Sequence, residues 1–272
     1  MFDHWLRVVL IVSGGALLYV AWLGQSGCEA AQDVARKSPA SAATQPADDP
    51  GFAVVELFTS EGCSSCPAAA PVLAELAEMR SRDGRRVFTL AFHVDYWNNL
   101  GWTDPFSLPA YSRRQEQYGR VLRLDNIYTP QAVVNGGTEF VGSDRQAADR
   151  AVRAALVTPA SNKVAISIAR DKAGGYRVTY SVAGDRAGSV LNLAVIEQGL
   201  SSDVLRGENA GRVLAEPSVV RWFDAVAIDS AGHGEVALSS ITGLRPDHAQ
   251  IVGYVQSRRT LAVSGATAAQ FP

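Results

Sequence analysis

The spacing of hydrophobic residues along the chain changes near Pro159. Before that point, residues 53–59 and 86–93 are short and almost continuously apolar, which is typical of strands covered on both faces. Between these runs, apolar residues recur at helical spacing as far as Gly84. The pattern predicts two parallel strands joined by a helical crossover.

The segment after the second apolar run predicts two more helices and a hairpin. An aromatic loop, DYWNNLGWTDPFSLP, leads to a helix that carries tyrosines on one face. Gly136 and Gly137 form the expected turn between two short strands, and Asp144 is expected to cap the last helix. The resulting order over residues 51–158, β-α-β-α-β-β-α, is that of the thioredoxin fold and gives an α/β class.

After Pro159 the hydrophobic pattern has a period of two, as in strands with one buried face. It begins at Val164, Ile166 and Ile168, and recurs after the expected turn at Gly174-Gly175. Further strands are expected near 190–197, 218–228, 234–240 and 249–257. Residues 159–263 therefore predict an antiparallel β-sandwich-like region that forms a layer of its own. The alternative is that these strands extend the first domain.

The first 50 residues do not have the pattern of a packed domain. Arg7 precedes an apolar stretch that ends at Leu23, so residues 1–28 predict a signal peptide or an uncleaved membrane anchor. Cys28 resembles the lipid-acceptor cysteine of a bacterial lipoprotein; otherwise it is an ordinary cysteine removed with the signal. Residues 29–50 are rich in Ala, Pro, Ser and Asp and predict a flexible linker. The folded part is expected to be periplasmic or secreted, with a membrane tether if the N-terminus is retained.

Composition and charge narrow the functional classes. Of the 272 residues, 47% are hydrophobic and 19% are charged, which allows a sizeable core. The formal net charge of −2 gives no electrostatic basis for binding nucleic acid. Three cysteines and four histidines without an H-x3–5-H pair do not supply a four-ligand zinc site. We therefore expect neither a metal nor a cofactor.

A C-x-x-C motif at residues 63–66 directly follows the first predicted strand and begins the first predicted helix. Helix starts stabilise thiolates through unpaired N–H groups and the positive end of the helix dipole. Cys63 is therefore the expected exposed nucleophile and Cys66 the expected resolving thiol. The alternative is a permanent bridge that fastens the turn. Pro67 fits the first helical turn, whereas Pro71 is expected to kink the helix.

Other polar residues of the first domain are supporting candidates. Glu56 lies in the first predicted strand, where a buried carboxylate can relay the proton of the resolving thiol, unless strand alternation turns it to the opposite face. His93 and Asp95 end the second predicted strand, at an edge where α/β sites form. The alternative is that His93 caps the strand and Asp95 fastens the aromatic loop.

Two further groups of side chains have two readings each. In the aromatic loop, three side chains either form a recognition surface beside the disulfide or anchor the loop itself: Tyr96, Trp97 and Trp102. A polar set between later strands is either a surface loop or a contact to the redox site: Arg206, Glu208, Asn209 and Arg212.

Four stretches stand out together: VVELFTSEGCSSCP, FHVDYWNNLGWTDPF, YTPQAVVNG and RGENAGRVL. They resemble the signatures of an exported, thioredoxin-like family, domain of unknown function 1223 (DUF1223), over roughly residues 52–257. Similarity to thioredoxins implies that Thr129-Pro130 forms a cis-proline loop facing the disulfide, so both residues join the candidate site. The chain departs from the family at Asn98, where an acidic residue is usual, and near Glu216, where a histidine is common. The family implies no substrate.

The function expected from these features is a thiol–disulfide oxidoreductase of the bacterial cell envelope. Its catalytic residues would be Cys63, Cys66 and Pro130, and its partners protein thiols or disulfides. One alternative is a copper chaperone in which Cys63 and Cys66, with His93, hold Cu(I). The other is a non-enzymatic envelope binding module with a structural disulfide.

Overall fold

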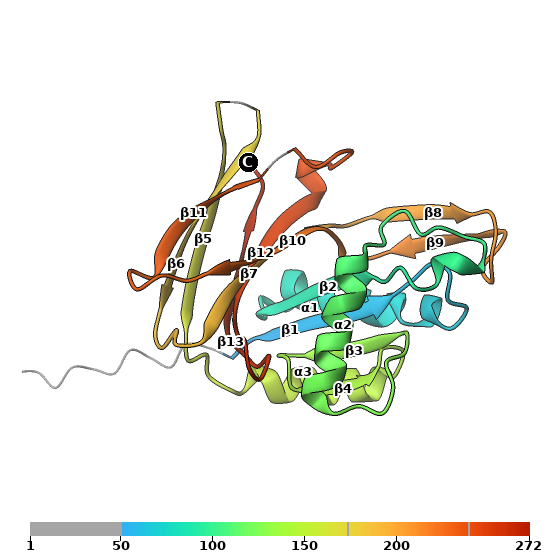
Figure 1. The fold of residues 1–272 in the computed structure, drawn as a ribbon, viewed down its shortest axis with the longest axis horizontal. Coiled ribbons are helices and arrows are strands. Elements are labelled where there is room, and N and C mark those ends of the chain that lie inside the picture. The colour runs from blue at the N-terminus through green and yellow to red at the C-terminus, as the bar shows by residue number, and fades with distance from the viewer. Residues whose placement is uncertain (1–50, 173, 239) are drawn as a thin grey trace, which may run out of the picture. The chain divides into compact units, whose positions relative to one another are not determined.

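The computed structural model describes residues 51–272, apart from residues 173 and 239 (Figure 1). The predicted signal peptide or anchor, the linker at 29–50 and Cys28 lie outside the described residues. Within them, no helix combines the length and apolar character that crossing a membrane requires.

The first half of the described chain has the predicted order of elements. Strands β1 and β2 are parallel neighbours, and the β3–β4 hairpin pairs antiparallel with β1 on its other side. The Asp144 side chain accepts a hydrogen bond from the Ala147 N–H, as the capping prediction requires. The elements are β1 (Ala53–Thr59), α1 (Ala70–Asp83), β2 (Val87–His93), α2 (Pro109–Leu122), β3 (Gln131–Val134), β4 (Thr138–Val141) and α3 (Arg145–Leu156).

The second half consists mainly of strands. They are β5 (Lys163–Arg170), β6 (Tyr176–Ala183), β7 (Ser189–Glu197), β8 (Leu200–Val204), β9 (Arg212–Glu216), β10 (Val219–Ala227), β11 (His233–Leu238), β12 (Ala249–Ser257) and β13 (Val263–Gln270). The period-two pattern predicts β5, β6, β7, β10, β11 and β12. It does not predict β8, β9 or β13, and β13 continues past the expected boundary at residue 263.

Strands from both halves of the described chain form one eight-stranded sheet, in the order β13-β12-β7-β10-β2-β1-β3-β4. Val219 of β10 pairs with Ala91 of β2, whose N–H donates to the Ser218 carbonyl at 2.8 Å. The prediction that the later strands form a separate layer is therefore wrong for β7, β10 and β12, which extend the first sheet together with β13. Alternation fixes which face of a strand is buried but not its neighbour, and the edge of β2 needs a hydrogen-bonding partner.

A second, three-stranded sheet has the order β11-β6-β5 and packs against the part of the large sheet that contains β7 and β12 (Figure 1). Val178 and Val182 of β6, Leu193 of β7 and Ile251 of β12 are buried in this common core. The two sheets therefore pack as in a sandwich, but the larger one also contains β1, β2, β3 and β4 from the first half of the described chain. The fold is mixed α/β, with a large sheet and few helices.

Helices cover both faces of the sheet around β1. Val55 and Leu57 share a core with α1 and α3. Val54 and Phe58 belong to a different core, which they share with residues of α2 and β12. Successive β1 residues thus point to opposite faces, as the pleat of a strand requires.

Glu56 lies on the face of β1 that α2 covers, where it forms a buried ion pair. Arg114 of α2 donates from Nε and Nη2 to the two carboxylate oxygens at 2.5 and 2.7 Å. Tyr118 and Tyr254 also donate to this carboxylate, so the pair joins β1, α2 and β12. Such partners offset the loss of hydration that burial imposes on the charges. Cys66 lies on the opposite, α1 side of the sheet. Of the two readings of Glu56, the one in which strand alternation turns it away from the thiol is therefore observed, and not the proton relay.

Replacing Arg114 with methionine should lower the free energy of unfolding by about 3–5 kcal/mol, because the Glu56 carboxylate would stay buried without its counter-charge. Chemical denaturation followed by circular dichroism measures the change. Arg113→Met is the matched control, since Arg113 is exposed on the same helix. Its replacement should change stability by less than about 0.5 kcal/mol. Equal stability of the two variants would contradict this role of the ion pair.

Candidate functional site

The C-x-x-C motif occupies two successive turns after β1, and Cys63 and Cys66 form a disulfide. The Cys63 N–H donates to the Ser60 carbonyl, and the Cys66 N–H donates to the Cys63 carbonyl, both at 3.2 Å. Cys66 then begins a 3-10 turn, Cys66–Ala68, and α1 starts only at Ala70. Pro71 lies in the first turn of α1, so it does not kink a continuous helix as predicted. The motif therefore precedes α1 instead of opening it.

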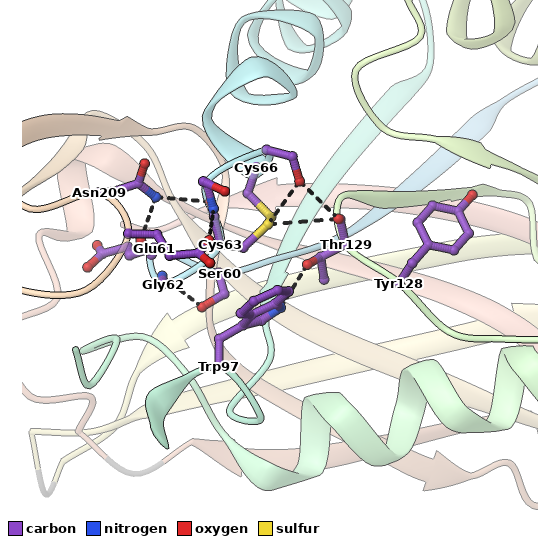
Figure 2. The surroundings of a disulfide bond; sticks show 12 residues. Ser60, Glu61, Gly62, Cys63, Cys66, Trp97, Tyr128, Thr129 and Asn209 are labelled. Atoms are coloured by element: carbon purple, nitrogen blue, oxygen red, sulfur yellow. Dashed lines mark hydrogen bonds between the residues drawn. A yellow bond between two sulfur atoms is a disulfide. The ribbon is translucent and has the colours of Figure 1, made fainter. Parts of the chain in front are cut away.

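Both cysteines are buried: Cys63 is 1% exposed and Cys66 3%. The prediction that Cys63 is an exposed nucleophile is wrong for this disulfide state. Its Sγ lies 3.3 Å from the Ser65 hydroxyl oxygen and 3.8 Å from the Thr129 carbonyl oxygen (Figure 2). Other segments of the chain therefore close over the turn, which the local sequence does not reveal.

The loop before β3 lies beside the disulfide. The Thr129–Pro130 peptide bond is cis, as predicted, and the Thr129 carbonyl faces Cys63 and accepts a hydrogen bond from Ser65 at 3.3 Å. The Trp97 indole donates to the Thr129 hydroxyl at 2.8 Å (Figure 2). Trp97 is thus an anchor of the aromatic loop and also part of the wall around the disulfide.

Strands β8 and β9 form a two-stranded arm. The loop that connects them contacts the motif, although it lies far from the motif in the sequence. Asn209 is 1% exposed and donates from Nδ2 to the carbonyls of Glu61 and Cys63 at 2.8 and 2.9 Å (Figure 2). The Ser64 N–H donates to the Glu208 carboxylate at 2.8 Å. For Glu208 and Asn209, contact with the C-x-x-C motif is therefore the observed reading. Arg212 contacts Asn209, and Arg206 is exposed.

A cluster of buried titratable side chains lies behind the motif. His93 is fully buried, its Nδ1 is 2.7 Å from Asp104 Oδ2, and its Nε2 is 3.5 Å from Glu216 Oε2. Asp104 also accepts from the Glu61 N–H, and the Trp102 indole donates to the Glu61 carboxylate at 2.7 Å. Among the residues that the structure describes, neither His93 Nε2 nor Glu61 Oε1 has a hydrogen-bond partner.

The members of this cluster shift one another's pKa values. Burial alone would lower the pKa of His93, but the carboxylates of Asp104, Glu216 and Glu61 raise it to about 9. Burial raises the pKa of Glu216 to about 7, with His93 opposing the shift and Glu61 and Asp104 adding to it. Burial would also raise the pKa of Asp104, but the adjacent His93 keeps it below its usual value. A positive His93 next to a negative Asp104 is the favoured arrangement at neutral pH.

Asp95 does not join this cluster. The Ser112 hydroxyl donates to its carboxylate at 2.5 Å, and the Asp95 N–H donates to the Ser112 oxygen at 3.1 Å. These bonds fasten the start of the aromatic loop to α2. The structural reading of Asp95 is therefore the observed one.

A pocket of about 410 Å³ lies between the start of α1 and the β8–β9 arm. Its walls are mostly apolar, with Leu57, Leu73 and Leu214 among them. Cys66 lines it from the motif, and Glu216 lines it from the end of β9. Cys66 and one member of the titratable cluster therefore border the same space.

The geometry does not assemble the copper ligands of the alternative reading. The His93 ring is held between Asp104 and Glu216. Among the residues that the structure describes, no group of three or more His, Cys, Asp or Glu side chains is arranged to hold a metal ion.

The sequence analysis assigns no role to Glu61 or Asp104. It names Asn209 only as one of two readings of a polar set, and Glu216 only as a departure from the family. Glu61 and Asp104 stand inside quoted motifs, so their position in the sequence was a usable signal. The roles of Asn209 and Glu216 depend on the pairing of β10 with β2, which no local pattern predicts.

Comparisons with known proteins confirm the family. A family model described as "Protein of unknown function (DUF1223)" matches residues 54–256, which is most of the chain. Among solved structures, the chain is similar to protein AGR_C_4864 from Agrobacterium tumefaciens, with 27% identity and a TM-score of 0.61 over 82% of this chain and 96% of that one. It is also similar to HBP35 of Porphyromonas gingivalis, with 16% identity and a TM-score of 0.61 over 82% and 76%, a likeness of fold alone. No curated protein matches the chain.

Replacing Asn209 with alanine should speed reduction of the disulfide by dithiothreitol at least about tenfold. The two lost hydrogen bonds are worth about 1 kcal/mol each, and every 1.4 kcal/mol is a factor of ten. Thiol release measured under native conditions gives the rate. Arg206→Ala is the control, since Arg206 is exposed on the same arm and should leave the rate unchanged. An Asn209→Ala rate equal to that of the parent chain would show that the arm does not protect the disulfide.

Proposed function

We propose that this chain, which belongs to the DUF1223 family, is a thiol–disulfide oxidoreductase that acts on protein cysteines in the bacterial cell envelope. The observation that carries the proposal is the position of the Cys63–Cys66 disulfide, directly after a central strand and against the Thr129 carbonyl. No metal or cofactor takes part, because thiol–disulfide exchange needs only the two sulfurs and a partner thiol or disulfide.

Residues 51–158 act in this proposal as a thioredoxin-like domain. The parallel β1–β2 pair, the antiparallel β3–β4 hairpin and the helices on both faces support this assignment. So does the cis Thr129–Pro130 bond beside the disulfide. The backbone of this loop would bind an extended segment of the partner by main-chain hydrogen bonds.

The chemistry would proceed through a mixed disulfide. A partner thiolate attacks Cys63 Sγ, the Cys63–Cys66 bond breaks, and its electron pair leaves on Cys66 Sγ. A second partner thiolate then attacks the partner sulfur of the mixed disulfide, releasing the oxidised partner and the Cys63 thiolate. The reverse sequence reduces a partner disulfide.

Access to Cys63 requires movement of the segments around it, because its side chain is 1% exposed in the disulfide state. The contacts that would open are those of Asn209 with the motif and of Trp97 with Thr129. Both come from loops, which are the usual moving parts of enzymes.

The same burial favours a second candidate function, a binding module in which the disulfide is structural. In that case Cys63 and Cys66 would fasten the turn and would not exchange with partners. Trapping of partners separates the two functions.

The Cys66→Ser chain, expressed with its full N-terminus in the source bacterium, should accumulate mixed disulfides through Cys63, because no resolving thiol remains to release the partner. Non-reducing gels and mass spectrometry identify the adducts. Cys63→Ser is the matched control, which retains the buried Cys66 and should trap far less.

We expect the trapped proteins to be exported ones, as the N-terminal expectation requires. Exclusively cytoplasmic partners would overturn the proposed location. A folded Cys66→Ser protein that traps no more than Cys63→Ser would overturn the enzymatic function in favour of the structural disulfide.

A further inference from the structure

We propose that Glu216 is the proton donor and acceptor of Cys66, and that His93 and Asp104 hold it in position for this role. The inference deepens the proposed function, on which it rests. It assigns the proton step of the redox pair to a side chain from the β8–β9 arm, about 150 residues away in the sequence.

The pocket between α1 and the arm provides the path. Cys66 and Glu216 both line this space of about 410 Å³, which is ample for a bridging water. Thr59 and Ser60 also line it. Glu216 is 8% exposed, so it exchanges its proton with groups in the pocket and with the neighbouring titratable cluster.

The charges around Glu216 explain why this carboxylate can hold a proton. It faces His93 of β2, Asp104 of the loop before α2 and Glu61 of the turn after β1. His93 and Asp104 form a close pair at 2.7 Å whose charges balance. Glu61 and Glu216 then remain as two buried carboxyl groups that repel each other when both ionise, which favours one proton between them. Arg212 lines the same pocket, but its guanidinium donates to Asn209 Oδ1 at 2.8 Å.

The proton balance of exchange fits this arrangement. When a partner thiolate attacks Cys63 Sγ, the leaving Cys66 thiolate takes the proton of the Glu216 carboxylic acid. In the reverse direction the Cys66 thiol gives its proton to the Glu216 carboxylate, and the thiolate attacks Cys63 of the mixed disulfide. An ordinary thiol with a pKa near 8.5 is mostly protonated at neutral pH, so this step benefits from a base.

The protonation state of Glu216 determines how the rate of exchange at Cys66 changes with pH. Because the pKa of Glu216 is about 7, the carboxylate form that accepts a proton increases as the pH rises through that value. Release of a mixed disulfide by Cys66 should therefore accelerate through about pH 7 and level off above it. The reverse step, which needs the acid form, should slow over the same range.

The test uses a mixed disulfide between Cys63 and a small chromogenic thiol, formed when the reduced full chain attacks the symmetric disulfide of that thiol and releases one equivalent of it. Stopped-flow absorbance then gives the rate at which Cys66 releases that thiol, as a function of pH. In Glu216→Gln the inflection near pH 7 should vanish and the rate at pH 7 should fall roughly 100-fold. Asp203→Asn is the control: it removes an exposed carboxylate from the same arm and should keep the parent profile.

A second measurement needs no variant. Infrared difference spectra between the reduced and oxidised parent chain, near pH 7, should show a change in a protonated carboxyl band. No band change, or a folded Glu216→Gln with the parent profile, overturns the relay. Neither measurement uses a protein partner, so both can succeed or fail independently of whether protein partners react. Failure of partner trapping alone would count against the proposed function and not against the relay.

Discussion

The pairing of β10 with β2 is the interaction on which the arrangement of the site depends. Val219 pairs with Ala91, and the Ser218 hydroxyl is 2.7 Å from that of Thr89. This short contact covers the edge of β2. It also fixes the position of the end of β9, which directly precedes β10 in the chain. Glu216 is thereby placed against His93. The loop of the arm is placed over the disulfide turn, so one strand pairing supplies both the cover and the acidic neighbour of the motif.

The consequence is that the surroundings of the disulfide are built from parts distant in the chain. The turn itself comes from the end of β1, its far wall from the cis-proline loop, and its cover from the arm (Figure 2). The disulfide is more enclosed than a surface redox centre would be, with both cysteines at most 3% exposed. Enclosure strengthens the electrostatic interactions of the cluster behind it, because water is excluded. It also makes access depend on loops that contact the motif through a few hydrogen bonds.

The sequence predicts the local elements well and their assembly less well. Hydrophobic periodicity predicts the order of the first half, and turn chemistry predicts the Asp144 cap. The cis Thr129–Pro130 loop follows from similarity to thioredoxins, not from spacing. Alternation leaves the facing of Glu56 open, and tertiary packing against α2 decides it. The enclosure of Cys63 and the position of Glu216 arise from pairing between residues far apart in sequence, which no window of the chain contains.

The reduction potential of Cys63 and Cys66 distinguishes an exchanging pair from a structural disulfide. Redox titration of the folded full chain against dithiol buffers, read by mass after alkylation, gives that potential. If Cys63 and Cys66 exchange with partners, they should form a reversible two-electron couple with a potential above about −300 mV, where labile disulfides lie. A pair that stays oxidised well below about −300 mV, or that is reduced only when the chain unfolds, would identify a structural disulfide and contradict the account.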